Sequence, residues 1–188
     1  VNGHTVESDV PASAVFTDTV TPVIDSLDSD SSTSALSAKQ GKALADLIST
    51  KKRTSRFVIG TSTAGWTAAD CDYLCDGTAD QTEINAAITA LPATGGEIVI
   101  LDGTYNITAK IDVTKDNVSI RGNGNATVLK RMFNSSVKEG VITLTSRSGC
   151  KIANLQVDGN KASYTNSNNC GIYLDSSSDN TVTGNTCN

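Results

Sequence analysis

Two pairs of residues at short spacing have side chains that can hold a metal ion. Cys71 and Cys75 lie four residues apart and offer two thiolates to zinc. A zinc site needs two further ligands, and the single histidine, His4, is far away in the sequence. Asp76 and Asp80 offer carboxylate oxygens to calcium, but their loop lacks the alternating ligands and terminal Glu of an EF-hand. We therefore expect no metal and no other cofactor, with calcium at the aspartate pair as the alternative.

The composition excludes several classes of protein. The chain has 188 residues and a net charge of −5, which argues against the basic face that a sequence-independent grip on nucleic acid requires. The longest apolar run is only four residues, at 98–101, so we expect no membrane insertion. Five cysteines without a tight framework indicate reduced, partly buried thiols rather than a disulfide scaffold. An apolar fraction of 38% and an aromatic fraction of 4% favour an elongated β-structure of short strands.

The first part of the chain divides into three predicted segments. Residues 1–33 carry strand-like pieces interrupted by prolines and end in a polar linker. Residues 34–53 have apolar residues at a helical period, with a capping box at Ser37 and Gln40 and a basic run at 51–53 that suits a helix end. Residues 54–66 are predicted to be a linker. The helix is short and its apolar stripe is narrow, so it should pack against copies of itself or against a neighbouring domain.

A second helix is predicted after the Asp76–Asp80 loop. Asp80 stands at its N-cap, Glu83 completes a capping-box pattern, and Pro92 with the following glycines ends it. Its apolar face is formed by Ile84, Ala87, Ile88 and Leu91.

From Glu97 onward the sequence predicts only short strands, separated by Gly, Asn and Asp turns. The strands recur in pairs at a constant offset of 30 residues, so that Ile142 matches Ile172, Ile152 matches Val182, and Val157 matches Cys187. A fixed period of this length with β-type units is typical of a solenoid, in which each turn buries its inward residues on the next. The last turn is therefore predicted to direct Ile172, Leu174, Val182 and Cys187 inward, and we expect the chain to be truncated at its C-terminal end.

Residues 67–188 resemble the start of the pectate-lyase-like right-handed β-helix superfamily. The resemblance lies in CDGTADQTEINAAITALPATGGEIVILDGTYNI and in NVSIRGNGNATVLKR, with Gln81 where a second Asp is common in the family. It implies a mainly β protein, a right-handed parallel β-helix whose N-terminal end is covered by the helix of Asp80, Ile84, Ala87, Ile88 and Leu91. The superfamily contains lyases, hydrolases and non-catalytic parts, so the resemblance is specific for fold and weak for chemistry.

The N-terminal part contains the stretches VNGHTVESDVPASAVFTDT and SALSAKQGKALADLI. They resemble segments of tail fibre and minor structural proteins of phages and prophages from Gram-positive bacteria, and the order of segments along the chain resembles that of a phage tail fibre or tailspike. This resemblance implies a homotrimer anchored through its N-terminus to other tail or baseplate proteins, located in the virion tail and assembled in the bacterial cytoplasm. The helix would then form a short three-stranded bundle through Leu36, Ala43, Leu44 and Leu47, unless it packs on its own chain's solenoid.

The same resemblance implies candidate chemistry, because lyases and depolymerases of this kind use carboxylates with calcium or in pairs. The candidates are Asp158, Asp175 and Asp179, with Arg147, Lys151 and Lys161 as basic groups. All three aspartates lie in turn-forming sequence, and Asx turn chemistry is the favoured interpretation. After Glu97 the only glutamate is Glu139, so no Glu–Asp pair is visible in phase. We therefore assign no catalytic residue.

The function predicted from the sequence is that of a structural, host-attachment component of a phage tail, displaying a β-helix towards host-surface glycan. The alternative is a polysaccharide lyase or hydrolase, that is, a tailspike depolymerase acting on bacterial surface or plant-type polysaccharide. A third interpretation is a bacterial surface adhesin without phage origin.

Overall fold

The computed structural model describes residues 23–24, 35–50 and 55–188. The chain divides into two compact units, residues 1–52 and residues 53–188, and each is described by itself. Of the predicted N-terminal β-rich segment, only residues 23–24 belong to the described part. The basic run at 51–53 lies outside it.

Unit 1 contains two short parallel strands and a helix. Strand β1 (Val23–Ile24) pairs with β2 (Ala35–Leu36), and helix α1 (Ala38–Thr50) follows directly. The predicted capping box is confirmed, because the Gln40 backbone N–H donates to Ser37 Oγ at 3.1 Å and the Ser37 N–H donates to Gln40 Oε1 at 3.2 Å. The helix is shorter than the predicted 34–53, since Ala35 and Leu36 belong to β2.

Unit 2 begins earlier than predicted. Residues 54–66 were expected to be a linker, but Arg56–Thr61 form strand β3, followed by a 3-10 turn, η1 (Ser62–Ala64), and by β4 (Tyr73–Cys75). Strand β3 lies between β4 and β5 (Gly96–Ile100) and pairs Phe57 with Ile98. The linker prediction is wrong for β3 because its partner β5 lies far along the sequence and leaves no local pattern.

Helix α2 (Gln81–Ala90) packs on β3, β4, β6 (Gly103–Ile107) and β7 (Ile111–Val113). Its apolar residues belong to the core, with Ile84, Ala87 and Ile88 fully buried and Leu91 3% exposed. The C-terminal end receives Lys115, whose Nζ donates to the Thr89 carbonyl at 2.6 Å and also to the Leu91 carbonyl.

The capping role predicted for the Asp80 side chain is wrong. Asp80 occupies the N-cap position, but its carboxylate makes no capping bond to the helix. Instead its Oδ1 accepts from the Gly77 N–H at 2.8 Å and its Oδ2 from the Asn106 N–H at 2.7 Å. The buried carboxylate therefore joins the preceding loop to β6, and the pKa of Asp80 is raised because burial disfavours its charged form.

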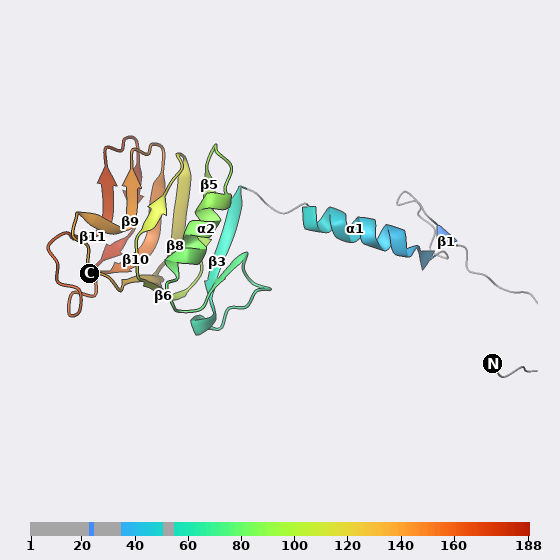
Figure 1. Ribbon diagram of the computed structural model, residues 1–188, viewed down its shortest axis with the longest axis horizontal. Coiled ribbons are helices and arrows are strands. Elements are labelled where there is room, and N and C mark those ends of the chain that lie inside the picture. The colour runs from blue at the N-terminus through green and yellow to red at the C-terminus, as the bar shows by residue number, and fades with distance from the viewer. Residues whose placement is uncertain (1–22, 25–34, 51–54) are drawn as a thin grey trace, which may run out of the picture. The chain divides into compact units, whose positions relative to one another are not determined.

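The remainder of unit 2 consists of parallel strands, and no helix follows residue 97 within the described residues. Figure 1 shows these strands side by side, with α2 lying over the end at which β3 and β5 are found. They are β6 (Gly103–Ile107), β7 (Ile111–Val113), β8 (Val118–Arg131), β9 (Glu139–Thr145), β10 (Lys151–Asp158), β11 (Asn169–Asp175), β12 (Thr181–Thr183) and β13 (Thr186–Cys187). Together with β3, β4 and β5 they form an eight-stranded sheet and a three-stranded sheet, so the unit is mainly β.

The periodic register predicted from the sequence is confirmed. Strand β11 pairs with β9 so that Ile172 aligns with Ile142. Strands β12 and β13 both pair with β10, aligning Val182 with Ile152 and Cys187 with Val157. In the preceding level of the stack, that is, the preceding set of strands, Ile111 aligns with Ile142 and Ile120 with Ile152. The offset between these residues is slightly longer than the offset between the later pairs. Buried isoleucines, valines and leucines therefore stack in rows through the unit.

The last strands are only partly covered. Ile172 packs against the core, as predicted for an inward residue. Leu174 and Val182 are 38% and 47% exposed, and Cys187 is also exposed, so these three residues, predicted to point inward, are not covered. Their register matches buried residues of β9 and β10, but no described strand pairs with the outer side of β11, β12 or β13.

The corners of the stacked strands repeat as the strands do. Three pairs of positions that are one period apart share a left-handed backbone conformation, with φ between 50° and 67°. The pairs are Ser146 with Ser176, Gly149 with Asp179, and Asn154 with Gly184. Gly, Asn and Asp tolerate positive φ, which explains the second and third pairs, whereas the two serines adopt it without that preference.

Two asparagines fasten the last level to the one before. Asn180 Oδ1 accepts from the Cys150 N–H at 2.8 Å while its Nδ2 donates to the Arg147 carbonyl at 3.0 Å. Asn185 does the same one strand along, accepting from the Leu155 N–H at 3.2 Å. Each side chain thus satisfies backbone groups that the turn leaves without a strand partner.

Candidate functional site

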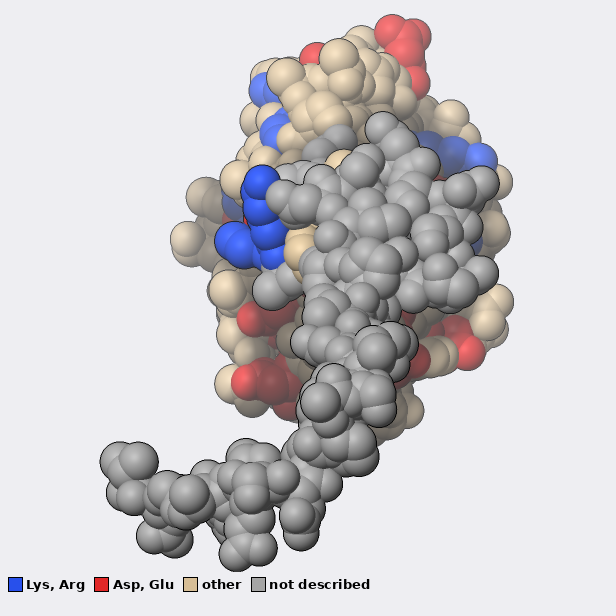
Figure 2. Space-filling view, turned by 90° about the vertical axis from the view of Figure 1, so that its right-hand side faces the viewer, with Lys and Arg blue, Asp and Glu red and all other residues tan. Residues whose placement is uncertain are grey.

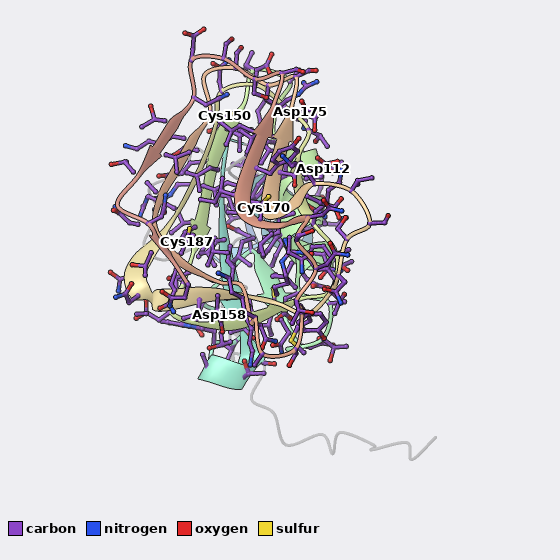
Figure 3. All side chains as sticks on the ribbon, turned by 90° about the vertical axis from the view of Figure 1, so that its left-hand side faces the viewer. Asp112, Cys150, Asp158, Cys170, Asp175 and Cys187 are labelled. Carbon is purple, nitrogen blue, oxygen red and sulfur yellow. The ribbon has the colours of Figure 1, made fainter. Side chains whose placement is uncertain are left out.

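The structure places the three candidate aspartates in or next to the turns between strands. Asp158 Oδ1 accepts from the Asn160 N–H at 2.8 Å, and Asp175 Oδ1 accepts from the Ser176 hydroxyl at 3.2 Å. Asp179 is exposed and occupies a corner with φ of 56°. Figure 3 shows Asp158 and Asp175 at opposite ends of the strands. Asp158 therefore makes the backbone contact of an Asx turn, while Asp175 and Asp179 lie beside or in a corner. Asp158 and Asp175 are not placed to flank one glycosidic bond.

The basic groups predicted beside them are also dispersed. Arg147 Nε donates to the Thr145 carbonyl at 3.0 Å, and its Nη1 lies 3.7 Å from Asp116. Lys151 is exposed on β10, and Lys161 is exposed at the edge of a cavity. None of the three makes a described ion pair with Asp158, Asp175 or Asp179.

Arg131 is the feature that the sequence did not reveal. It is the largest fully buried side chain, 1% exposed, and stands at the end of β8. Its Nη2 donates to the Glu139 carbonyl at 2.9 Å and to the Cys170 carbonyl at 2.7 Å, and its guanidinium lies 4.1 Å from the centre of the Phe133 ring. Burial lowers the pKa of Arg131. One cation therefore joins the start of β9 to the start of β11.

Arg131 also lines a cavity of about 560 Å³. The walls come from the 159–171 loop region and from the last two residues, and include Lys161, Tyr164, Asn169 and Cys187. Figure 3 shows Cys170 and Cys187 on neighbouring parts of this end of the unit. Because Asn188 forms part of the wall, the cavity belongs to the uncovered last level of strands.

A group of possible metal ligands lies at the start of α2 and in the strand before it. Cys75, Asp80 and Glu83 each place one possible ligand atom within 4.8 Å of the others. Both Asp80 oxygens already accept backbone N–H groups, and burial raises the pKa of the Cys75 thiol, which is fully buried. A protonated thiol is a poor metal ligand. In the pair considered for calcium, Asp76 Oδ1 accepts from the Thr78 N–H at 2.8 Å, and calcium binding by Asp76 and Asp80 stays a prediction.

The predicted interface residues of α1 are exposed on the isolated chain. Leu44 and Leu47 are 40% and 47% exposed, and Ala43 is exposed beside them. Leu36 belongs by its backbone to β2, and its side chain lies outside the described part. Exposed leucines three residues apart lie on one face of a helix, where a partner can cover them.

The charged surface has no single sign on the face that is shown. In Figure 2, basic and acidic side chains both appear on this face. Arg56 Nε and Arg121 Nε both contact the Glu97 carboxylate, at 2.8 and 2.7 Å. No helix among the described residues is long and apolar enough to cross a membrane.

Two comparisons with known proteins found similarity to phage proteins. Residues 23–56 match the family of phage tail fiber repeats. The chain is similar in structure to ORF18 of Geobacillus virus E2, with a TM-score of 0.53 and 22% sequence identity over 76% of this chain. It spans 28% of the length of that viral protein, and the likeness at this identity shows the fold alone. No curated protein matches. Together the two matches support a phage tail structural component.

Proposed function

We propose that this chain is part of a phage tail fibre that displays a stacked β-structure towards host-surface glycan. The observation that carries the proposal is the coincidence of a tail-fibre repeat at 23–56 with parallel strands in periodic register over the rest of the chain. Repeating turns of this kind build a stiff rod, because each level contacts only its neighbours. A rod that carries a recognition surface away from an anchored end is what host attachment requires.

The stacked unit is, in this proposal, a right-handed β-helix of the pectate-lyase-like kind. Parallel pairing at a nearly constant offset and left-handed corners at fixed positions support it. Helix α2 would close one end, because its buried Ile84, Ala87 and Ile88 cover core residues of the first strands.

The chain is proposed to form a homotrimer through α1. The exposed pair Leu44 and Leu47 supports an intermolecular contact, with Leu36 and Ala43 as further members. Light scattering on the whole chain should give about three times the 19.5 kDa chain mass. The double variant Leu44→Lys, Leu47→Lys should lower this mass, whereas Lys42→Ala on the same helix should not. A monomeric parent chain would contradict the trimer.

The N-terminal segment is proposed to bind other tail or baseplate proteins, so that the fibre is a component of the virion tail assembled in the bacterial cytoplasm. Labelled chain should bind whole cells from a panel of Gram-positive bacteria that includes Geobacillus. Digestion of the surface polysaccharide should abolish the binding, and binding that survives this treatment would contradict a glycan target.

A polysaccharide lyase or hydrolase stays the alternative. It predicts release of reducing ends or unsaturated sugars from the bound polysaccharide, and loss of that activity in Asp158→Ala or Asp175→Ala. Activity with this dependence would replace the attachment proposal with an enzymatic one.

A further inference from the structure

A small cleft in unit 2 has no lining residue from the last strands and none of the predicted site residues. It has a volume of about 290 Å³ and is lined by Trp66, by residues 99–102 at the end of β5, and by residues 121–123 of β8. Trp66 is the single tryptophan of the chain and follows η1, in the segment that the sequence suggested was a linker. The cleft therefore joins residues from three separate parts of the sequence.

Each polar side chain around the cleft is held in place by one hydrogen bond. Trp66 Nε1 donates to the Asp102 carbonyl at 2.7 Å, and Asn123 Nδ2 donates to Asp102 Oδ1 at 3.0 Å. Arg121 Nε donates to Glu97 Oε1 at 2.7 Å. The orientations of the indole, the amide, the carboxylate and the guanidinium are thus fixed before any ligand arrives, which lowers the entropic cost of binding.

The remaining atoms of these groups make no hydrogen bond with any described residue. They are Asp102 Oδ2, Asn123 Oδ1 and the two Nη groups of Arg121. The cleft consequently presents two planar acceptors and a planar donor next to an aromatic ring and the apolar side chains of Val99 and Leu101.

We propose that this cleft binds one or two sugar rings of an uncharged saccharide. Vicinal hydroxyls donate to acceptors such as Asp102 and Asn123 and accept from Arg121, while the apolar face of a pyranose packs on the indole. The volume lies at the lower end of small-ligand pockets, which suits a short saccharide unit rather than a peptide or a protein. The Asp102 carboxylate and the Glu97–Arg121 ion pair leave no surplus positive charge for a phosphate or uronate. The ligand class rests on the proposed attachment function, whereas the location rests on the cleft alone.

The single tryptophan allows a direct test, because its fluorescence reports only on this cleft. Glucose, galactose, rhamnose and N-acetylglucosamine, with their di- and trisaccharides, are titrated into the full chain. At least one of them should shift the emission of Trp66 in a saturable way. Asn123→Ala and Asp102→Asn should weaken that saccharide at least about tenfold. Both variants keep the Trp66 bond, because the acceptor is a backbone carbonyl, and Asp179→Asn is the matched control at an exposed corner.

Two further outcomes separate this site from the proposed function. Absence of any saturable shift with all the sugars, while the chain still binds whole cells, overturns the cleft proposal and leaves the attachment function standing. A saturable shift that Asn123→Ala abolishes supports the cleft, even if the chain fails to bind any cell of the panel. A shift that both cleft variants leave unchanged overturns the assignment of these residues.

Discussion

Replacing Arg131 should show how strongly one buried cation fastens consecutive levels of strands. Its two shortest hydrogen bonds, of 2.9 and 2.7 Å, run to the carbonyls of Glu139 and Cys170. Hydrogen bonds to charged groups contribute about 1.5–3 kcal/mol each, so losing both costs about 3–6 kcal/mol. Methionine in its place recovers several kcal/mol of the desolvation that a buried charge suffers. We therefore expect Arg131→Met to lower the free energy of unfolding by about 2 kcal/mol.

Lysine at the same position gives the sharper comparison. Arg131→Lys keeps the buried charge and its desolvation cost, but a single ammonium does not reproduce the planar fork that spans two carbonyls. It also weakens the contact with the Phe133 ring, where Arg131 lies 4.1 Å from the centroid. The lysine variant should consequently be less stable than the methionine variant, by about 1 kcal/mol or more.

Urea unfolding of both variants, followed by far-UV circular dichroism and by Trp66 fluorescence, measures these differences. Coincident transitions by the two probes justify comparing free energies between variants. Full stability of Arg131→Met, within about 0.5 kcal/mol of the parent, would refute the reasoning, because it would show that the two carbonyl bonds contribute nothing net. So would a lysine variant as stable as the parent.

Three other predictions follow from local geometry. Asn180→Ala should lower the free energy of unfolding by about 1–3 kcal/mol, because it removes the hydrogen-bond partner of the buried Cys150 N–H. Urea unfolding measures the difference, and an Asn180→Ser variant of unchanged stability would contradict the prediction. The exposed Cys187 should react with a thiol reagent at pH 8 within minutes, whereas the buried Cys75, whose pKa is raised, should react only when the chain unfolds. Peptide mapping of the labelled chain measures both reactions, and equal rates would contradict the buried position of Cys75. Burial raises the pKa of Asp80, so any stability that the parent has over Asp80→Asn should be fully present below the ordinary pKa of an aspartate. This difference in stability should decrease as the pH rises through the raised pKa. Melting curves in which the difference increases with pH would contradict the prediction.

Periodic features of the fold could be predicted from the sequence, and solitary ones could not. The matches of Ile142 with Ile172 and of Ile152 with Val182 were visible because equivalent positions in neighbouring levels carry the same residue types. The capping box of Ser37 and Gln40 was visible because it is local in sequence. Both kinds of signal depend on fixed spacing, which a single chain displays without any structure.

The features that escaped prediction all depend on contacts between distant residues. Strand β3 pairs with a strand much later in the chain, and its sequence carries no repeat of that partner. Arg131 would be placed on the surface by its residue type, yet carbonyls from β9 and β11 make its burial tolerable. Trp66 meets Asp102 across 36 residues, and Asp80 bonds to Asn106 across 26. No spacing rule connects such pairs.

The central claim is that residues one period apart lie side by side on neighbouring parallel strands. Spin labels at Lys151 and Thr181, which are register partners on β10 and β12, test it most directly in a chain whose five cysteines have been replaced. Adjacent strands lie about 4.8 Å apart, so the two labels should show strong dipolar broadening that either single label lacks. Spectra of the double-labelled chain that equal the sum of the single-labelled ones would contradict the periodic register and the stacked fold built on it.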